Sequence, residues 1–277
     1  MKTVKIQDRK MKMIKQHLGK SLLAAALVLG STAFLSTHAS ARDLPEIRND
    51  VFKVANSGAY PPFSFVDTSG NVVGFDVDIA KALAERMGVD VDIQTSPWSG
   101  IVAALAGGRF DACICSMSVT EERQRAVDFT DSYYSSGLSV WVRSDNDDVN
   151  SLDDLQGKRV GSTIGETGNQ WAVENGQGKW RNQTFQGLPD MLTGLTTGRV
   201  DAIIADDVPV YVALAESDLA IKMVDVGELP RWPAAISIQK NKPELLAALN
   251  TALEEIKADG TYQSIVDKWI GEGADID

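Results

Sequence analysis

The sequence predicts an α/β protein of two similar lobes, each built on a parallel-rich sheet flanked by helices. The first observation is an internal repeat. "IVAALAGGRFDACICS" at 101–116 and "MLTGLTTGRVDAIIAD" at 191–206 each contain an apolar helix, a Gly-Arg turn and a strand that opens with Asp-Ala. The second is that these strands are almost wholly apolar, which is typical of parallel strands covered on both faces. The third is that a strand precedes each repeat, "VFKVAN" from 51 and "KRVGST" from 158. These patterns favour two related lobes over a chance likeness of two helix–strand turns.

The remaining elements agree with an α/β chain. Apolar stripes at helical spacing predict one helix over 76–88, ending at Gly88, and another over 243–260. A strand is expected over 233–240, and the polar stretch 143–154 has no apolar periodicity and is expected to be a surface loop.

The first 41 residues have the pattern of a cleaved signal peptide. Seven Lys or Arg residues precede Ser21, a short apolar run follows, and "ASA" at 39–41 provides a cleavage site before Arg42. The apolar run is too short to span a bilayer, and no cysteine follows the cleavage site to carry a lipid. We therefore expect a soluble periplasmic protein that is not embedded in the membrane.

The charge of the mature chain excludes one class of partner. The removed segment holds 7 basic and 1 acidic residue, so the other 236 residues hold 20 Lys and Arg against 37 Asp and Glu, a net charge of about −17. Because nucleic-acid affinity depends on neutralising phosphates, no nucleic-acid partner is expected.

Histidine and cysteine usage narrows the chemistry. Both histidines, His17 and His38, lie in the predicted signal peptide, so no histidine triad and no histidine-rich metal site is expected. Only Cys113 and Cys115 remain. In an extended strand their Cα atoms would lie about 6.5 to 7 Å apart, at the limit for a disulfide, which predicts two buried thiols. No metal and no cofactor is predicted.

Polar side chains mark the carboxyl ends of the two repeated strands, where ligands collect in parallel sheets. Ser116 ends the first strand, with Ser118 and Thr120 beside it, and Asp206 ends the second. Arg123 stands in the first turn of the next helix, where it faces the positive end of the helix dipole and requires an anion, from the protein or from a ligand. Hydroxyls and a guanidinium on one lobe and a carboxylate on the other suit a zwitterion.

The chain resembles the periplasmic solute-binding proteins of ABC-type polar amino acid importers, with glutamine and basic amino acid binders as the nearest kin. The resemblance covers essentially the whole mature chain. Its markers are "YPPFSF" at 60–65, "GFDVDIAKALA" at 74–84, "SMSVTEERQRAVDFTDSYYSSG" at 116–137, "SLDDLQGKRVG" at 151–161, "GRVDAIIAD" at 198–206 and "DGTYQSIVDKW" at 259–269.

The resemblance implies a monomeric two-lobed clamp that closes on an amino acid and delivers it to a membrane permease. It places the first lobe at 42–137 and 232–277 and the second at 138–231, with hinge crossings near 137–141 and 226–232. Binding without catalysis is expected.

The resemblance also assigns site residues. It implies that Tyr60 and Trp98 are aromatic walls and that Ser116, Ser118 and Arg123 receive the carboxylate of the ligand, with Thr167 as a further donor. It also implies that Asp206 accepts the ammonium group and that Cys115 lies at the edge of the pocket. Asn56 stands where basic amino acid binders place an acid, which argues against a lysine or arginine ligand. Glu166 stands where relatives carry a small residue, and it would suit a cationic or amide side chain.

Two other functions are weighed. A cyclohexadienyl dehydratase has the same fold, but its chemistry requires an acid just after the second-lobe Gly-x-Thr turn. Asn169 occupies that place and has no proton to give, and Glu166, three residues earlier, is expected to face differently. A sensory ligand-binding module would need a transmembrane segment and a signalling domain, and neither is expected.

Overall fold

The computed structural model describes residues 44–272 and 274. The predicted signal peptide and both histidines lie outside the described residues. The described elements, in chain order, are η1 (Arg48–Asp50), β1 (Val51–Asn56), β2 (Ala59–Tyr60), β3 (Ser64–Val66), β4 (Val72–Val73), α1 (Phe75–Met87), β5 (Asp90–Thr95), α2 (Trp98–Ala106), β6 (Ala112–Cys113), α3 (Glu121–Ala126), β7 (Val127–Arg143), η2 (Asp153–Leu155), β8 (Arg159–Thr163), α4 (Thr167–Asn175), β9 (Arg181–Phe185), α5 (Leu188–Thr196), β10 (Ala202–Asp206), α6 (Asp207–Glu216), β11 (Ile221–Val224), β12 (Arg231–Gln239), α7 (Pro243–Ala258) and α8 (Thr261–Trp269).

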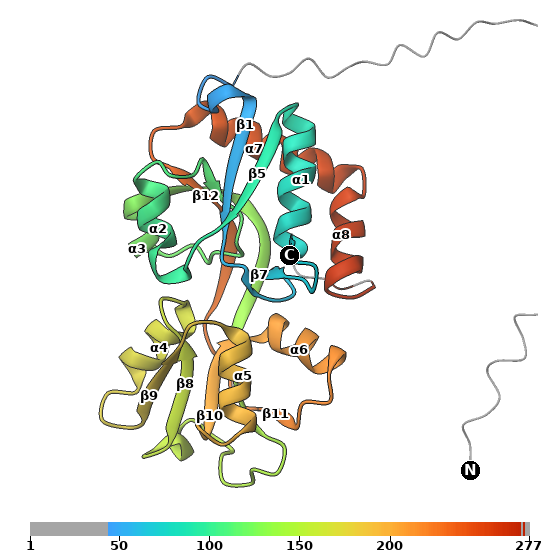
Figure 1. The fold of residues 1–277 in the computed structure, drawn as a ribbon. Coiled ribbons are helices and arrows are strands. Elements are labelled where there is room, and N and C mark those ends of the chain that lie inside the picture. Colours follow the sequence, from blue (N-terminus) through green and yellow to red (C-terminus); the bar gives the residue numbers. More distant parts are fainter. Residues whose placement is uncertain (1–43, 273, 275–277) are drawn as a thin grey trace, which may run out of the picture. The chain divides into compact units, whose positions relative to one another are not determined.

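Two lobes share one long strand, β7 (Figure 1). In the first lobe the strand order is β5–β1–β6–β12–β7, and in the second it is β7–β10–β8–β9, with β11 also paired to β7. The strands β5, β1 and β6 pair in parallel, and so do β10, β8 and β9. In this sheet every pair that includes β7 or β12 is antiparallel. The predicted two-lobed α/β fold is confirmed.

The pairing of β7 changes partner at one point. Gly137 of β7 lies opposite Arg231, the first residue of β12, and the next residue, Leu138, lies opposite Asp206 at the end of β10. The chain thus passes between the lobes along β7 and again at the start of β12, and Asp206 lies beside that passage.

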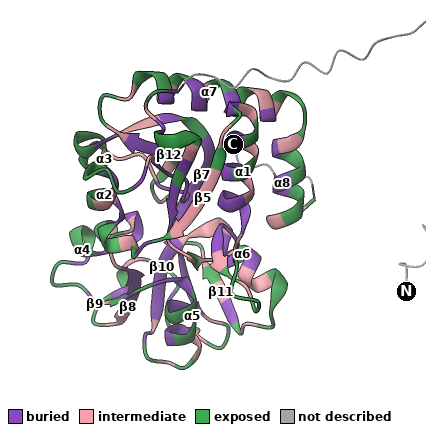
Figure 2. Cartoon of the chain, turned by 45° about the horizontal axis from the view of Figure 1, so that its top comes forward, coloured by how far each residue is buried: buried purple, intermediate pink, exposed green. Residues whose placement is uncertain are grey.

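Helices cover both faces of the first-lobe sheet. Alternate residues of β1, such as Val54, pack with α1, α7 and α8 on one face, whereas Ala55 packs with Ile101 and Leu105 of α2 on the other. Helix α1 ends at Gly88, whose φ of 74° is the left-handed conformation that glycine adopts without penalty. Buried residues concentrate in central strands such as β7 and β10, and exposed residues on the outer faces of the helices (Figure 2).

The internal repeat corresponds to two equivalent structural units, α2 with β6 and α5 with β10. The repeated aspartates make the same contacts. Asp111 accepts a hydrogen bond from the backbone N–H of Lys53 in β1 at 2.8 Å, and Asp201 accepts one from the backbone N–H of Arg159 in β8 at 2.8 Å. Each aspartate therefore fixes the start of its strand against the neighbouring parallel strand.

The prediction of two free thiols is wrong, because Cys113 and Cys115 form a disulfide. Strand β6 ends at Cys113, so the backbone beyond it is not extended and the two Cα atoms lie 5.6 Å apart. That separation is within the usual disulfide range. The prediction assumed a strand that continued to residue 116.

None of the helices among the described residues has both the length and the apolar character needed to cross a membrane. The same part of the chain holds no cluster of three or more acidic, histidine or cysteine side chains arranged to bind a metal ion.

Candidate ligand-binding site

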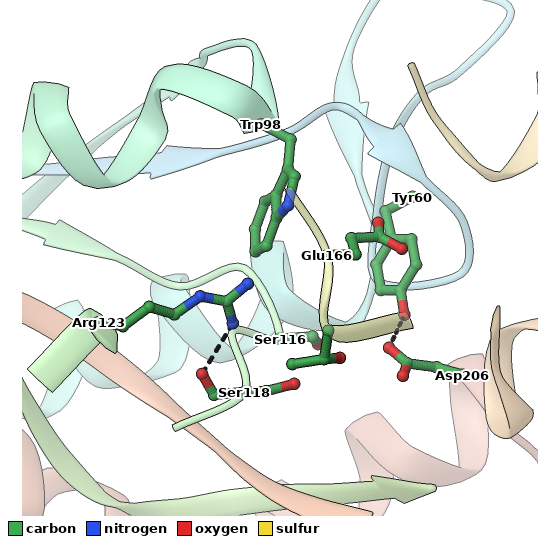
Figure 3. A pocket seen from close by; sticks show the side chains of 8 residues that line it. Tyr60, Trp98, Ser116, Ser118, Arg123, Glu166 and Asp206 are labelled. Atoms are coloured by element: carbon green, nitrogen blue, oxygen red, sulfur yellow. Dashed lines mark hydrogen bonds between the residues drawn. The ribbon is translucent and has the colours of Figure 1, made fainter. Parts of the chain in front are cut away.

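A pocket lies where the carboxyl ends of β6 and β10 approach each other, and residues of both lobes line it (Figure 3). Its lining consists of Tyr60, Trp98, Ser116, Ser118, Arg123, Glu166, Thr167 and Asp206. The structure thus brings together eight of the ten residues singled out in the sequence. Asn56 and Cys115 are not among them.

The corner after β6 is held by backbone hydrogen bonds. Ser116 has a φ of 50°, an uncommon left-handed conformation, and its N–H donates to the Tyr133 hydroxyl at 2.8 Å. Ser118 forms an isolated bridge with Ala234 of β12. Thr120 caps α3 and accepts a hydrogen bond from the Arg123 N–H at 3.3 Å. Its hydroxyl therefore serves the helix rather than the pocket.

The guanidinium of Arg123 is held in the pocket by two backbone carbonyl groups. It donates to the Ser118 carbonyl at 2.8 Å and to the Gly165 carbonyl of the second lobe at 3.0 Å, and it lies 5.3 Å from the ring centre of Trp98. Gly165 has a φ of 80°, so a residue other than glycine would be strained there. Within residues 44–272 no carboxylate forms an ion pair with Arg123, although Glu166 and Asp206 lie near enough to raise its pKa against the lowering caused by burial.

Asp206 provides the carboxylate of the second lobe. It occupies the N-cap position of α6, but its side chain makes no capping hydrogen bond. Instead it accepts a hydrogen bond from the Tyr60 hydroxyl of the first lobe at 2.7 Å. Removal from water raises the pKa of Asp206 to about 6, an effect that the hydrogen bond from Tyr60 only partly opposes.

Glu166 is a second acid in the same pocket, whereas Asn169, three residues later, does not line it. It precedes Thr167, the first residue of α4, and its side chain extends between Trp98 and Tyr60 (Figure 3). Burial raises the pKa of Glu166 to about 8, and the charge of Asp206 adds to the rise, whereas Arg123 and a hydrogen bond with Thr163 lower it.

One buried acid, which contacts the pocket residue Ser116, was not predicted from the sequence. Asp76, at the start of α1, is fully buried and accepts hydrogen bonds from the Tyr133 hydroxyl at 2.7 Å and the Ser116 hydroxyl at 3.1 Å. A serine hydroxyl has one proton to donate. Ser116 thus turns its proton away from the pocket, and the donor role expected for this hydroxyl does not fit the geometry. The only signal was an aspartate among the apolar residues that open a buried helix.

Asp76 is expected to make the ligand-free protein less stable as pH rises. Burial raises its pKa to about 7, above the value of about 4 in an unfolded chain. Its contribution to the free energy of unfolding is therefore fully present below about pH 4 and is lost as pH rises through 7. Asp206 and Glu166 act in the same direction. We expect a lower melting temperature at pH 8 than at pH 5.

The variant Asp76→Asn should reduce that difference, because an amide does not ionise. Glu85→Gln, an exposed position on the same helix, is the matched control and should leave it unchanged. Calorimetric melting between pH 5 and pH 8 measures the effect. A difference that is the same in Asp76→Asn as in the parent would contradict the role of this carboxyl.

The two residues outside the pocket lining lie in the interior of the first lobe. Asn56 ends β1 and is fully buried, and neither its side-chain nitrogen nor its oxygen has a hydrogen-bond partner among the described residues. Cys115 is 3% exposed and packs in the cluster around Ile101 and Leu105. The disulfide leaves it no thiol to offer at a pocket edge.

This fold, with a polar pocket between two lobes, defines a class of binding protein, and comparison with known sequences identifies the family. Residues 52–272 match the bacterial extracellular solute-binding proteins, family 3. The chain belongs to this family, which confirms the resemblance seen in its motifs.

Individual relatives are similar over most of their length. The chain is 32% identical to the L-cystine-binding protein TcyJ of Escherichia coli K12, over 92% of this chain and 97% of that protein. It is 31% identical to the ABC transporter arginine-binding protein 1 of the same strain, over 77% and 88%. Among solved structures, an ancestral arginine-binding protein bound to glutamine matches with a TM-score of 0.75 and 36% identity, over 82% of this chain and 100% of that one.

Proposed function

We propose that this protein binds an amino acid in the pocket between its lobes and delivers it to the membrane permease of an ABC transporter. The observation that carries the proposal is Arg123, a guanidinium in the pocket that makes hydrogen bonds to two carbonyl oxygens but no ion pair with a carboxylate of the described chain. A ligand carboxylate would neutralise it with charge-assisted, bidentate hydrogen bonds.

The opposite end of the pocket suits an ammonium group. Asp206 can pair with a cation, and the Ser116 hydroxyl, whose proton is given to Asp76, presents only lone pairs. The hydroxyls of Ser118 and Thr167 retain a proton for the carboxylate end, and the amino end of α4, at Thr167, adds free backbone N–H groups. The pocket therefore has the polarity of an α-amino acid.

The family supports the cellular setting of the proposal. Its members are bacterial and extracellular, and similar proteins are named as binding components for cystine, arginine and histidine. We propose that residues 1–41 direct export to the periplasm, that 42–137 with 232–277 and 138–231 form the two lobes, and that the mature protein acts as a monomer.

Binding without chemical conversion is part of the proposal. One similar structure, 35% identical with a TM-score of 0.74, is an ancestral amino acid-binding protein described as a precursor of cyclohexadienyl dehydratase. In this chain Asn169, at the place where that chemistry needs an acid, donates its amide to the Ser162 hydroxyl at 2.9 Å and does not line the pocket. We expect a bound amino acid to be recovered unchanged.

A melting-temperature screen of the mature protein against the common amino acids tests the proposed function. A ligand present at about a thousand times its dissociation constant adds about 4 kcal/mol to the free energy of unfolding. We expect at least one L-amino acid to produce a clear upward shift, and the same compound with its carboxylate amidated to produce none. If no amino acid raises the melting temperature, either in this screen or when melting is followed by calorimetry, the proposal is contradicted.

A further inference from the structure

The charges in the pocket do not balance for an ordinary zwitterion. One cation, Arg123, faces two acids, Glu166 and Asp206. When an α-amino acid places its carboxylate at Arg123 and its ammonium at Asp206, Glu166 is left without a partner of opposite charge. A carboxylate removed from water without such a partner is costly, so it must either keep a proton or receive a second cation.

The position of Glu166 favours the second cation. It occupies the N-cap position of α4, yet its side chain makes no capping hydrogen bond and extends into the pocket instead (Figure 3). Short polar side chains are the usual N-caps, so the longer side chain of this glutamate is not needed to cap the helix. The neighbouring rings of Trp98 and Tyr60 add faces that attract a cation by cation–π interaction.

We propose that Glu166 is the specificity-determining residue of this site and selects amino acids whose side chain carries a positive charge. The inference rests on the proposed function, since it takes the α-carboxylate to be at Arg123 and the α-ammonium at Asp206. It assigns the side chain of the ligand to the end of the pocket lined by Glu166, Trp98 and Tyr60. It replaces the expectation from Asn56 that argued against lysine and arginine, because Asn56 is buried outside the pocket lining and Glu166 supplies an acid within it.

Selection by Glu166 depends on its proton. The groups that face it are Tyr60 from β2, Arg123 from α3, Asp206 from β10 and Thr163 from β8. Burial, together with the charge of Asp206, keeps the Glu166 carboxyl protonated near neutral pH. A cationic side chain needs the ionised carboxylate and displaces the proton, whereas a neutral side chain leaves it in place. Linkage then requires the preference for the cationic ligand to rise by about tenfold for each unit of pH below about 8, the pKa of Glu166, and to level off above it.

L-Arginine and L-citrulline form the sharpest pair of probes. They share the α-carboxylate, the α-ammonium and the length of the side chain, and differ in that citrulline carries an uncharged ureido group where arginine has a guanidinium. The ratio of their dissociation constants cancels the effect of pH on Asp206, which meets the same ammonium in both. Isothermal titration calorimetry from pH 6.5 to 8.5 gives that ratio for each variant.

The parent protein is expected to prefer arginine increasingly as pH rises towards 8, by about tenfold per pH unit, and to release up to one proton on binding it. Glu166→Gln should give a ratio that does not change with pH and should release no proton from this site. Glu174→Gln, an exposed position on the same helix, is the matched control and should behave as the parent.

Two outcomes would overturn the inference, and they are distinguishable. If the parent binds amino acids but its ratio stays flat with pH, or if Glu166→Gln keeps the slope of the parent, Glu166 is not the selector and the proposed function stands. If neither these two nor any other amino acid binds, the proposed function fails and the inference fails with it.

Discussion

Arg123→Ala is expected to weaken the binding of an amino acid by about two to four orders of magnitude. Removing one partner of a buried ion pair costs about 3 to 5 kcal/mol, because the other charge is left buried and unpaired. At about 1.4 kcal/mol per factor of ten, that cost gives the stated range. The loss should be large because Arg123 is the only cation lining the pocket in the described chain.

Titration calorimetry with the ligand found by screening measures this loss. Arg125→Ala is the matched control, since Arg125 lies on the same helix and is exposed, and its affinity should equal that of the parent. Circular dichroism establishes that both variants are folded. An Arg123→Ala protein that is folded and binds within about threefold of the parent would refute the carboxylate role of Arg123.

Asp206→Asn should cost nearly as much for any ligand with an α-ammonium, about two to three orders of magnitude. An asparagine oxygen can still accept the hydrogen bond from Tyr60, so the local structure should persist. The variant should bind the desamino analogue of the same ligand about as well as the parent does. Asp218→Asn, exposed in the same lobe, is the control. Equal losses for both ligands would mean that Asp206 does not meet the ammonium.

The same carboxylate predicts a pH dependence. The pKa of Asp206 is raised to about 6, so below that pH the group is protonated and cannot pair with an ammonium. The affinity of the parent should therefore fall by about tenfold per pH unit below pH 6, whereas Asp206→Asn should lose this dependence.

Local patterns in the sequence were sufficient to predict the architecture. The repeat of helix, Gly-Arg turn and strand foretold α2 with β6 and α5 with β10, because apolar periodicity and glycine turns act over a few residues. The apolar residues at helical spacing over 76–88 likewise predicted α1, and the helix ends at Gly88 as expected. These elements depend on interactions that a short window of sequence contains.

Contacts between distant residues could not be predicted in the same way. The hydrogen bonds that join Asp76 to Ser116 and to Tyr133 span 40 and 57 residues, and nothing local marks their partners. The disulfide was missed for a different reason, since its geometry depends on where β6 ends, and strand ends are poorly marked in sequence. The direction of the Glu166 side chain similarly depends on the turn before α4, where Glu166 takes the N-cap position without a side-chain capping hydrogen bond.

The division of charge between the lobes has a consequence for affinity. The first lobe presents Arg123 and the second presents Asp206 and Glu166, so each lobe taken separately is a weak receptor for one end of an amino acid. Because β7 and β12 tether the two receptors, an amino acid acts as a bivalent ligand: once one end is bound, the other meets its receptor at a high effective concentration. A compound with only one of the two charged groups forfeits this gain. Discrimination against simple carboxylates and simple amines is then built into the two-lobed design, independently of how well any side chain fits.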